Sequence, residues 1–479
     1  MRLGCAEKPR PPRAQARRSS QIALVGMATG FVEATLAQLF KIRDDKGQFR
    51  GGPAYYMEKG LGARWMGILF SIFLIIAFGF VFNSVQANTI TGAMQGAFGV
   101  PTWISGIAVV ILTALIIFGG LRSIARFSEL AVPFMAVAYL LLAVGIILFN
   151  LSELPGVLAM VVKSAFGWHE AAAGGIGAAI LNGFKRGLFS NEAGMGSAPN
   201  AAASATPYPP HPASQGYVQM AGVFIDTLLI CTASAAIILL AGPQEGEGIM
   251  LVQNALTSQV GDWGRYFLAV IILFFAFTSI VANYFYAENC LVFLEHNHLA
   301  GLLIFRLIVL AMVMFGALAS LPFVWNLADV SMGLMAITNL IAILLLSNLA
   351  IKLAKDYNAQ RKAGKLPTFD ASQFPEVQQK LEPGIAHIQN TAPGPPSVIA
   401  TATPATLPVP TRAAREVQSA WNEEIPESSD WRLPLSTLKV WPKWRNWINP
   451  RRTVKYRPQP TSSQMRILPQ IRPLSRSTT

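Results

Sequence analysis

The sequence predicts an all-α polytopic membrane protein, and two observations support that fold class. First, 52% of the 479 residues are hydrophobic and only 13% are charged. Second, apolar runs of about 20 residues, the length that spans a bilayer, recur along the chain without a polar face. A soluble protein of this composition would need such a face on every helix. A soluble enzyme is therefore excluded.

The formal net charge of +13 is carried by the two ends of the chain. Residues 1–20 contain six Lys and Arg against one acidic residue, residues 21–357 contain 15 against 16, and residues 358–479 contain 17 against eight. We therefore expect a basic leader at 1–20 and a nearly neutral membrane core at 21–357. Because the excess of basic residues lies outside this core, nucleic acid is not an expected partner.

Nine segments are predicted to be membrane spans. They are residues 21–41, 66–90, 102–120, 128–150, 171–204, 216–241, 265–289, 303–320 and 328–351. The fifth segment contains Lys185, Arg186 and the glycine-rich run SNEAGMGSAPN at 190–200. Such a sequence is tolerated at membrane depth only where it lines a cavity or is buried in protein.

The loops between these spans differ in Lys and Arg, which are enriched on the cytoplasmic side. Loops 42–65 and 352–365 contain five basic residues each, whereas loop 242–264 contains none. We therefore expect the first two loops and the C-terminus to be cytoplasmic. This orientation puts the basic leader on the outer face, although basic flanks resist translocation.

Residues 391–479 are rich in Pro, Ser, Thr and charge, and we predict that this tail is disordered. Four tryptophans between 431 and 447 lie among its basic residues. A segment of this kind either adheres to anionic lipid or is a solvated tail of incidental composition, and the second is more typical of charge runs. No cofactor or metal ion is predicted, because the three cysteines are too scattered for a metal site.

Two clusters of polar residues inside the spans suit a small ligand. Phe82, Asn83 and Gln86 in FGFVFNSVQANT place an aromatic ring and two amides on one helix face, which suits a small zwitterion. Thr278 and Ser279 in FAFTSIVANYFYAEN supply uncharged oxygen ligands of the kind that a small cation takes. The alternatives are interhelical hydrogen bonds for the amides and bonds to the helix backbone for the hydroxyls.

The run at 190–200 is a third candidate site. Gly194 and Gly196 allow the chain to leave helical geometry, and Asn191 and Glu192 accompany them. Half-helix ends made in this way bind ions in secondary transporters. The alternative is a helix-packing motif of small residues.

Longer runs of the sequence resemble one known family. The likeness lies in GMATGFVEATLAQLFKIRDDKGQFRGGPAYYMEKGLG, AFGFVFNSVQANTI, GFKRGLFSNEAGMGSAPNAAA, HPASQGYVQMAGVFIDTLL and WNLADVSMGLMAITNLIA. These runs are similar to the alanine or glycine:cation symporter family, bacterial inner-membrane carriers that couple sodium or proton entry to uptake of small neutral amino acids. The resemblance extends from about Ala23 to Pro375, so residues 358–390 are interpreted as the family's cytoplasmic C-terminal extension.

The resemblance implies a five-plus-five inverted-repeat core, LeuT-like, of the amino acid-polyamine-organocation superfamily, with substrate bound between broken helices. The nine spans then correspond to core helices two to ten, and a break falls at 190–197. The sodium site falls on Thr278 and Ser279. Many relatives carry a tryptophan where this chain has Asn283, which leaves pocket size and selectivity open.

The polar clusters and the family resemblance together indicate a set of candidate site residues. Substrate is expected at Phe82, Asn83, Gln86, Asn191, Gly194, Gly196 and Asn283, and the coupling cation, Na⁺ or H⁺, at Thr278 and Ser279.

The chain departs from the family at its N-terminus. Relatives begin with an extra helix and a core helix one that has an unwound GTGN-type centre, whereas residues 1–22 resemble nothing in the family. We therefore expect that the chain lacks its first core helix and that, as written, it is impaired in transport.

The predicted function is secondary active symport of alanine or glycine with sodium, or with protons, across the bacterial inner membrane, with no enzymatic activity. Membrane lipid is the other expected partner, and no obligate protein partner is predicted. The alternative is a non-transporting membrane scaffold whose tail at 391–479 binds lipid or a partner. An intramembrane enzyme that uses Glu192 and Asp226 is disfavoured, because no nucleophile or metal set accompanies them.

Overall fold

The structure is a computed structural model of the chain. It describes the backbone of residues 13–44, 47–119, 121–157, 159, 183, 185–295 and 298–382, and their side chains except at 13–24 and 121–131. Met1–Val398 form one unit and Ile399–Thr479 a second, and every described residue belongs to the first. The tail predicted at 391–479 therefore lies outside the described residues, as do residues 1–12 of the leader.

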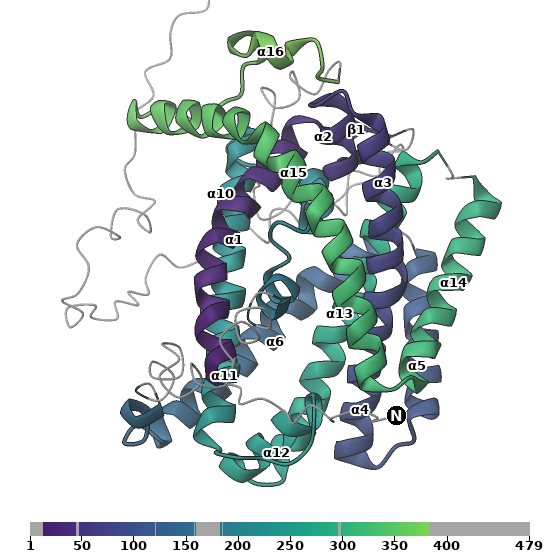
Figure 1. The fold of residues 1–479 in the computed structure, drawn as a ribbon, viewed down its shortest axis with the longest axis vertical. Helices are drawn as coiled ribbons and strands as arrows, with labels where there is room; N and C mark the ends of the chain where they lie inside the picture. The colour runs from purple at the N-terminus through teal and green to yellow at the C-terminus, as the bar shows by residue number, and fades with distance from the viewer. Residues whose placement is uncertain are drawn as a thin grey trace, which may run out of the picture. The chain divides into compact units, whose positions relative to one another are not determined.

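Helices make up almost all of the described structure (Figure 1). They are α1 (Arg13–Leu39), α2 (Pro53–Lys59), α3 (Arg64–Leu74), α4 (Phe82–Phe98), α5 (Thr102–Gly119), α6 (Leu121–Phe149), α9 (Ala198–Ser204), α10 (Pro212–Val223), α11 (Cys231–Leu240), α12 (Ile249–Val260), α13 (Trp263–Phe293), α14 (Leu299–Leu318), α15 (Leu321–Lys362), the 3₁₀ turn η4 (Ala371–Gln373) and α16 (Pro375–Gln378). The π-helical stretches η1 (Ile75–Val81) and η3 (Phe224–Ile230) join α3 to α4 and α10 to α11. After α1, β1 (Ile42–Arg43) and β2 (Phe49–Arg50) form a short antiparallel ribbon.

Seven helical stretches among the described residues are long and apolar enough to cross a membrane. They are Arg64–Phe98, Thr102–Gly119, Val132–Phe149, Pro212–Leu240, Trp263–Phe293, Leu299–Leu318 and Leu321–Lys362. Each coincides with one of the nine predicted spans, which confirms the all-α polytopic class, while the inverted repeat stays a prediction.

The other two predicted spans behave differently. Segment 21–41 is helical as far as Leu39, the last residue of α1. Helix α1 begins at Arg13, inside the expected leader, and is not among the seven stretches. Segment 171–204 lies outside the described residues up to 182, and beyond that point it is not one continuous helix.

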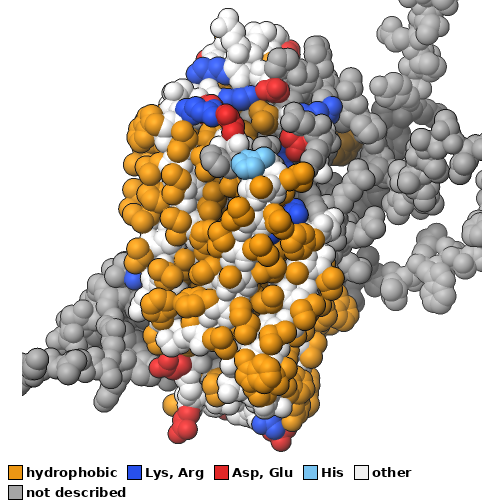
Figure 2. All heavy atoms as spheres, turned by 90° about the vertical axis from the view of Figure 1, so that its right-hand side faces the viewer, with side chains coloured by type: hydrophobic (Ala, Val, Ile, Leu, Met, Phe, Trp, Pro, Cys, Tyr) orange, Lys and Arg blue, Asp and Glu red, His pale blue; other side chains and the backbone are white. Residues whose placement is uncertain are grey.

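The described helices expose a largely apolar surface. Figure 2 shows a broad band of hydrophobic side chains between two ends that carry charged ones. Leu115, Leu141 and Leu344, on three different spanning helices, are 69%, 68% and 71% exposed. A continuous apolar surface of this kind is typical of a face in contact with lipid.

Helices α4 and α14 pack with their backbones in direct contact. A Cβ on Gly316 would overlap the backbone of Ser84. The Ser84 hydroxyl donates to the Met312 carbonyl at 2.8 Å, and Asn88 Nδ2 donates to the carbonyls of Gly316 and Ala319 at 3.0 and 2.7 Å. Small residues and interhelical hydrogen bonds hold helices together in lipid, where burial of apolar surface gives little drive for association.

The two ends of the helical bundle differ in charge. The ribbon, α2 and α16 lie at one end, and α12 lies at the other (Figure 1). The first end carries ion pairs such as Lys352 with Glu376, whose charged atoms are 2.6 Å apart. The chain at the second end, 242–264, contains Glu245 and Glu247 but no Lys or Arg. The loops predicted to be cytoplasmic by charge, 42–65 and 352–365, thus lie together.

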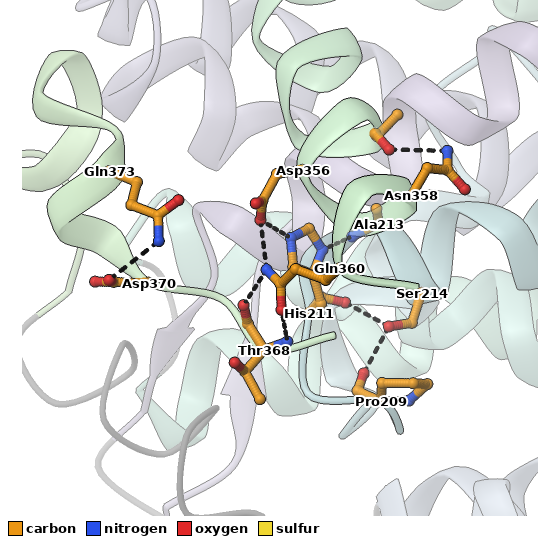
Figure 3. A network of polar contacts seen from close by, with 11 residues as sticks. Pro209, His211, Ala213, Ser214, Asp356, Asn358, Gln360, Thr368, Asp370 and Gln373 are labelled. Carbon is orange, nitrogen blue, oxygen red and sulfur yellow. Dashed lines mark hydrogen bonds and ion pairs between the residues drawn. The ribbon is translucent and has the colours of Figure 1, made fainter. Parts of the chain in front are cut away.

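Residues 365–382, which we name the C-terminal strap, fold back over the end of α15. The backbone N–H of Phe369 donates to the carbonyl of Pro210, ahead of α10, at 3.0 Å. Gln360 and the backbone of Thr368 exchange two hydrogen bonds of 2.9 Å each (Figure 3). The strap therefore ties the chain before α10 to the last turns of α15.

Candidate functional site

The helix that leads into the glycine-rich run is interrupted as the sequence predicts. It ends at Asn191, and α9 begins only at Ala198. Between them, Gly194 and Gly196 have φ angles of +90° and +89°. Glycine adopts these angles without steric cost, whereas other residues do so rarely. We name residues 192–197 the broken segment.

Side chains from α1, α2 and α15 hold the broken segment. Glu33 Oε2 accepts the backbone N–H of Gly194 at 2.9 Å. Asn339 Nδ2 donates to the carbonyl of Gly194 at 3.1 Å and also to Glu33 Oε1. The Tyr56 hydroxyl donates to Asn339 Oδ1. Glu33 is 1% exposed and both Tyr56 and Asn339 are 0% exposed, so these contacts lie deep in the protein.

Local hydrogen bonds satisfy other polar groups of the broken segment. The Ser197 hydroxyl donates to Glu192 Oε2 at 2.6 Å, and the backbone N–H of Ala193 donates to Asn191 Oδ1 at 3.0 Å. Asn200 Nδ2 donates to the carbonyl of Ser197 at 2.9 Å. These bonds replace the intrahelical ones that the interruption removes.

Of the residues predicted on α4, Phe82 lies beside the helix that leads into the broken segment. Its ring stacks on Phe189, with centroids 4.9 Å apart, and on Phe78, with centroids 4.4 Å apart. Asn83 is fully buried, and its Oδ1 has no hydrogen-bond partner among the described residues. Gln86 is half-buried about one turn further along α4. The structure thus brings Phe82 to the helix before the broken segment, and the ligand roles of all three residues stay predictions.

The predicted cation ligands on α13 bond to their own helix. The hydroxyls of Thr278 and Ser279 both donate to the carbonyl of Phe275, at 2.9 and 3.1 Å. This is the backbone bonding that the sequence offered as the alternative. A hydroxyl that donates its proton still has lone pairs to offer a cation, so the two readings are compatible and the cation role stays a prediction.

The buried side-chain amides of Asn191 and Asn283 each have a nitrogen donor without a partner among the described residues. Asn191, at the end of the interrupted helix, is 6% exposed, and Asn283, on α13, is 2% exposed. In the part of the chain that the structure describes, neither Nδ2 has a hydrogen-bond partner. Unsatisfied buried donors are rare in folded proteins and mark places where water, an ion or a ligand binds.

A charged cluster of Lys185, Arg186 and Asp329 lies before the broken segment. Lys185 Nζ and an Arg186 terminal nitrogen each lie 3.1 Å from Asp329 Oδ2. The Arg186 guanidinium carbon lies 4.1 Å from the centre of the Trp325 ring, which in turn lies 4.6 Å from that of Phe189. The cluster joins the helix before the break to the first turns of α15.

Sequence reasoning does not assign the groups that hold the broken segment. Glu33 is an acidic residue within the predicted span 21–41, and no local pattern pairs it with Tyr56 or Asn339. A buried ionisable residue in a span does indicate function, but its partners depend on how the helices pack. Among the described residues, no group of three His, Cys, Asp or Glu is arranged to hold a metal ion.

The geometry is suited to reversible binding of a small polar solute. The bundle of membrane-spanning helices contains an interrupted helix, buried amides and hydroxyls, and stacked aromatic rings. In secondary transporters, such interruptions are tolerated because they line a binding site, and their freed backbone groups bind ions and substrates.

Comparison with known proteins gives the family. The family model described as the sodium:alanine symporter family matches residues 20–371. The chain is 51% identical over 358 residues to the amino-acid carrier protein AlsT of Bacillus subtilis (strain 168), which covers 74% of this chain and 76% of AlsT.

Two further relatives carry more specific names. The chain is 50% identical over 351 residues to the probable sodium/glutamine symporter GlnT of Bacillus subtilis (strain 168), with 73% of each protein covered. It is 38% identical over 350 residues to the sodium/alanine symporter AgcS of Methanococcus maripaludis, with 71% of this chain and 76% of AgcS covered. These relatives are transporters rather than enzymes. The chain belongs to the sodium:alanine symporter family.

Proposed function

We propose that the chain carries out secondary active symport of a small neutral amino acid, alanine or glycine, with sodium, or with protons, as the coupling ion. The observation that carries this proposal is the broken segment, which lies among spanning helices and directly follows the buried amide of Asn191, whose Nδ2 has no partner in the described structure. Membership of the sodium:alanine symporter family supports an amino acid and a cation as the ligands.

The amino acid is proposed to bind between α4, the broken segment and α13. Its site is formed by Phe82, Asn83, Gln86, Asn191, Gly194, Gly196 and Asn283. Among the described residues, Nδ2 of Asn191 and of Asn283 and Oδ1 of Asn83 have no hydrogen-bond partner. The two donors suit the substrate carboxylate, and the acceptor suits the ammonium group. Gly194 contributes through the shape of the break, because its own N–H and carbonyl are bonded to Glu33 and Asn339.

The coupling cation is proposed to bind the hydroxyl oxygens of Thr278 and Ser279. These oxygens carry no charge of their own, and each keeps lone pairs after donating to the helix backbone. Symport requires that cation and amino acid favour the same state of the protein, so each raises the affinity for the other by the same factor.

We further propose that this symporter has a five-plus-five inverted-repeat core and lies in the cell inner membrane with its C-terminus in the cytoplasm. The orientation is supported by the Lys and Arg of loops 42–65 and 352–365, which lie at the same end of the bundle as the C-terminal strap. The exposed apolar band supplies the contact with membrane lipid.

Proteoliposomes that contain this chain alone test the proposal. Labelled alanine, glycine and glutamine are offered under an inward sodium gradient, with a potassium gradient, a proton gradient and protein-free vesicles as controls. We expect alanine or glycine uptake that depends on the cation gradient. Uptake equal to that of protein-free vesicles, together with no sodium-dependent binding of any of the three amino acids, would refute the proposal.

A further inference from the structure

The backbone of Gly194 is bonded by side chains on both of its polar groups. Its N–H donates to Glu33 Oε2 on α1 at 2.9 Å, and its carbonyl accepts from Asn339 Nδ2 on α15 at 3.1 Å. In an uninterrupted helix, backbone groups one turn away would make both bonds. Two side chains from other helices therefore take over the bonding that the break removes.

The same hydrogen bonds determine how the Asn339 amide is oriented. Its nitrogen faces two oxygen acceptors, Glu33 Oε1 and the Gly194 carbonyl, and its oxygen accepts from the Tyr56 hydroxyl. The flipped amide would set its oxygen against those two acceptors, so only one orientation satisfies the set. The network therefore runs from Tyr56 on α2 through Asn339 to both Glu33 and the broken segment.

The broken segment also has little room to move against these helices. A Cβ on Gly194 would lie 3.3 Å from Leu340 Cδ2 on α15 and 3.6 Å from Thr29 Oγ1 on α1. A Cβ on Gly196 would come within 2.8 Å of the Pro53 ring at the start of α2. The hydrogen bonds and the packing thus locate the broken segment against the same three helices.

We propose that Glu33 is a positioning residue of the symport site, which acts by holding the backbone of the broken segment through Gly194. The expected effect of Glu33 on amino-acid binding rests on the proposed function. Glu33 holds the stretch of chain that also carries Asn191 and Phe189, so it determines where these two residues lie. A carboxyl group offers two acceptor oxygens, one for the Gly194 N–H and one for the Asn339 amide, whereas a glutamine offers only one. Glu33 itself is not proposed to touch the amino acid.

Hydrogen exchange of the purified full chain tests the positioning directly. In Glu33→Gln, the backbone amides of residues 190–200 are expected to exchange at least about tenfold faster than in the parent chain, because glutamine has one acceptor oxygen for the two N–H donors, on Gly194 and Asn339, that Glu33 accepts. Tyr56→Phe removes one hydroxyl that only orients Asn339, and it should speed exchange of the same peptide at least about twofold. Because this second change is small and keeps the ring, it remains informative where Glu33→Gln fails to fold.

Gln253→Ala is the matched control. Gln253 is 3% exposed and donates to the carbonyl of Ala93 at 3.0 Å, so its loss removes a buried side-chain-to-backbone bond between α12 and α4, away from the broken segment. Exchange at 190–200 is expected to be unchanged in this variant.

Uptake by the same variants separates the inference from the proposed function. Glu33→Gln is expected to raise the KM for the amino acid at least about tenfold, while Gln253→Ala leaves KM unchanged at a similar melting temperature. Parental exchange at 190–200 in both Glu33→Gln and Tyr56→Phe would overturn the inference, whatever the uptake results. Absence of cation-dependent uptake in the parent chain would instead overturn the proposed function, and the exchange data would still decide whether Glu33 holds the break.

Discussion

His211 and Asp356 join the start of α10 to the last turns of α15, with Nε2 lying 3.1 Å from Oδ2 (Figure 3). The other ring nitrogen, Nδ1, accepts the backbone N–H of Ala213 at 3.1 Å and so caps α10. A nitrogen that accepts cannot carry a proton, so the neutral ring has its proton on Nε2 and donates it to Asp356. Protonation of Nδ1 would remove the cap.

We expect the protein to lose stability as the pH falls below about 6.5. Burial lowers the pKa of His211 from its ordinary value, and Asp356 opposes this shift only in part. An unfolded chain therefore takes up the histidine proton at a higher pH than the folded chain does. The unfolded state binds more protons in that window, so the free energy of unfolding falls as the pH drops through it, by at most about 1.4 kcal/mol per pH unit.

The His211 contribution is measured as the difference between two melting-temperature profiles taken from about pH 7.5 down to about pH 5. His211→Asn is the comparison, because asparagine keeps a side-chain oxygen to cap α10 but does not titrate. The parent chain should lose more stability on acidification than the variant. Parallel profiles would show that His211 does not contribute in this range.

Gly316→Ala is expected to destabilise the pairing of α4 and α14. The added Cβ overlaps the backbone of Ser84, which forces the helices apart and strains the bonds from Asn88. We expect the free energy of unfolding to fall by about 1–3 kcal/mol, measured by thermal or denaturant unfolding of the purified protein. Gly333→Ala on α15 is the control: its Cβ meets nothing within 4 Å, so a gain of about 0.5–1 kcal/mol is expected. Equal effects of the two changes would contradict the packing argument.

Asp329→Asn is expected to weaken the junction between α15 and the helix before the break. It leaves Arg186, which is only 28% exposed, without its anionic partner. We expect the free energy of unfolding to fall by about 1–3 kcal/mol, which is less than the loss expected when a fully buried ion pair is broken. Lys352→Ala removes an exposed ion pair with Glu376 and should cost less than about 1 kcal/mol in the same unfolding measurement. A loss no larger than that of the control would show that the charged cluster contributes little.

Thr278→Ala and Ser279→Ala are expected to raise the sodium concentration for half-maximal uptake at least about tenfold each, because each removes one proposed oxygen ligand. Ser347→Ala serves as the control, since this hydroxyl also bonds to its own helix, at 2.8 Å from the Leu344 carbonyl, but lies on the exposed side of α15. Sodium titrations of uptake in proteoliposomes provide the measurement. An unchanged sodium dependence in both α13 variants would remove the proposed cation site.

The sequence by itself determined the features that depend on short stretches of chain. A run of about 20 apolar residues is a membrane span whatever surrounds it, and for this reason seven of the nine predicted spans coincide with spanning helices. Gly194 and Gly196 similarly indicate an interruption, because only glycine reaches their φ angles at no cost. Family membership also follows from the order of residues alone.

Tertiary structure alone decided which polar groups meet. Glu33 and Asn339 are 306 positions apart in the chain, and His211 and Asp356 are 145 apart. Their contacts depend on how far each helix is rotated about its axis and on which helices are neighbours, and neither quantity is encoded in a local pattern. The partner of an acidic residue in a span is therefore known only from the packed structure. A buried acidic residue without a partner would destabilise the fold, so the packed helices supply one.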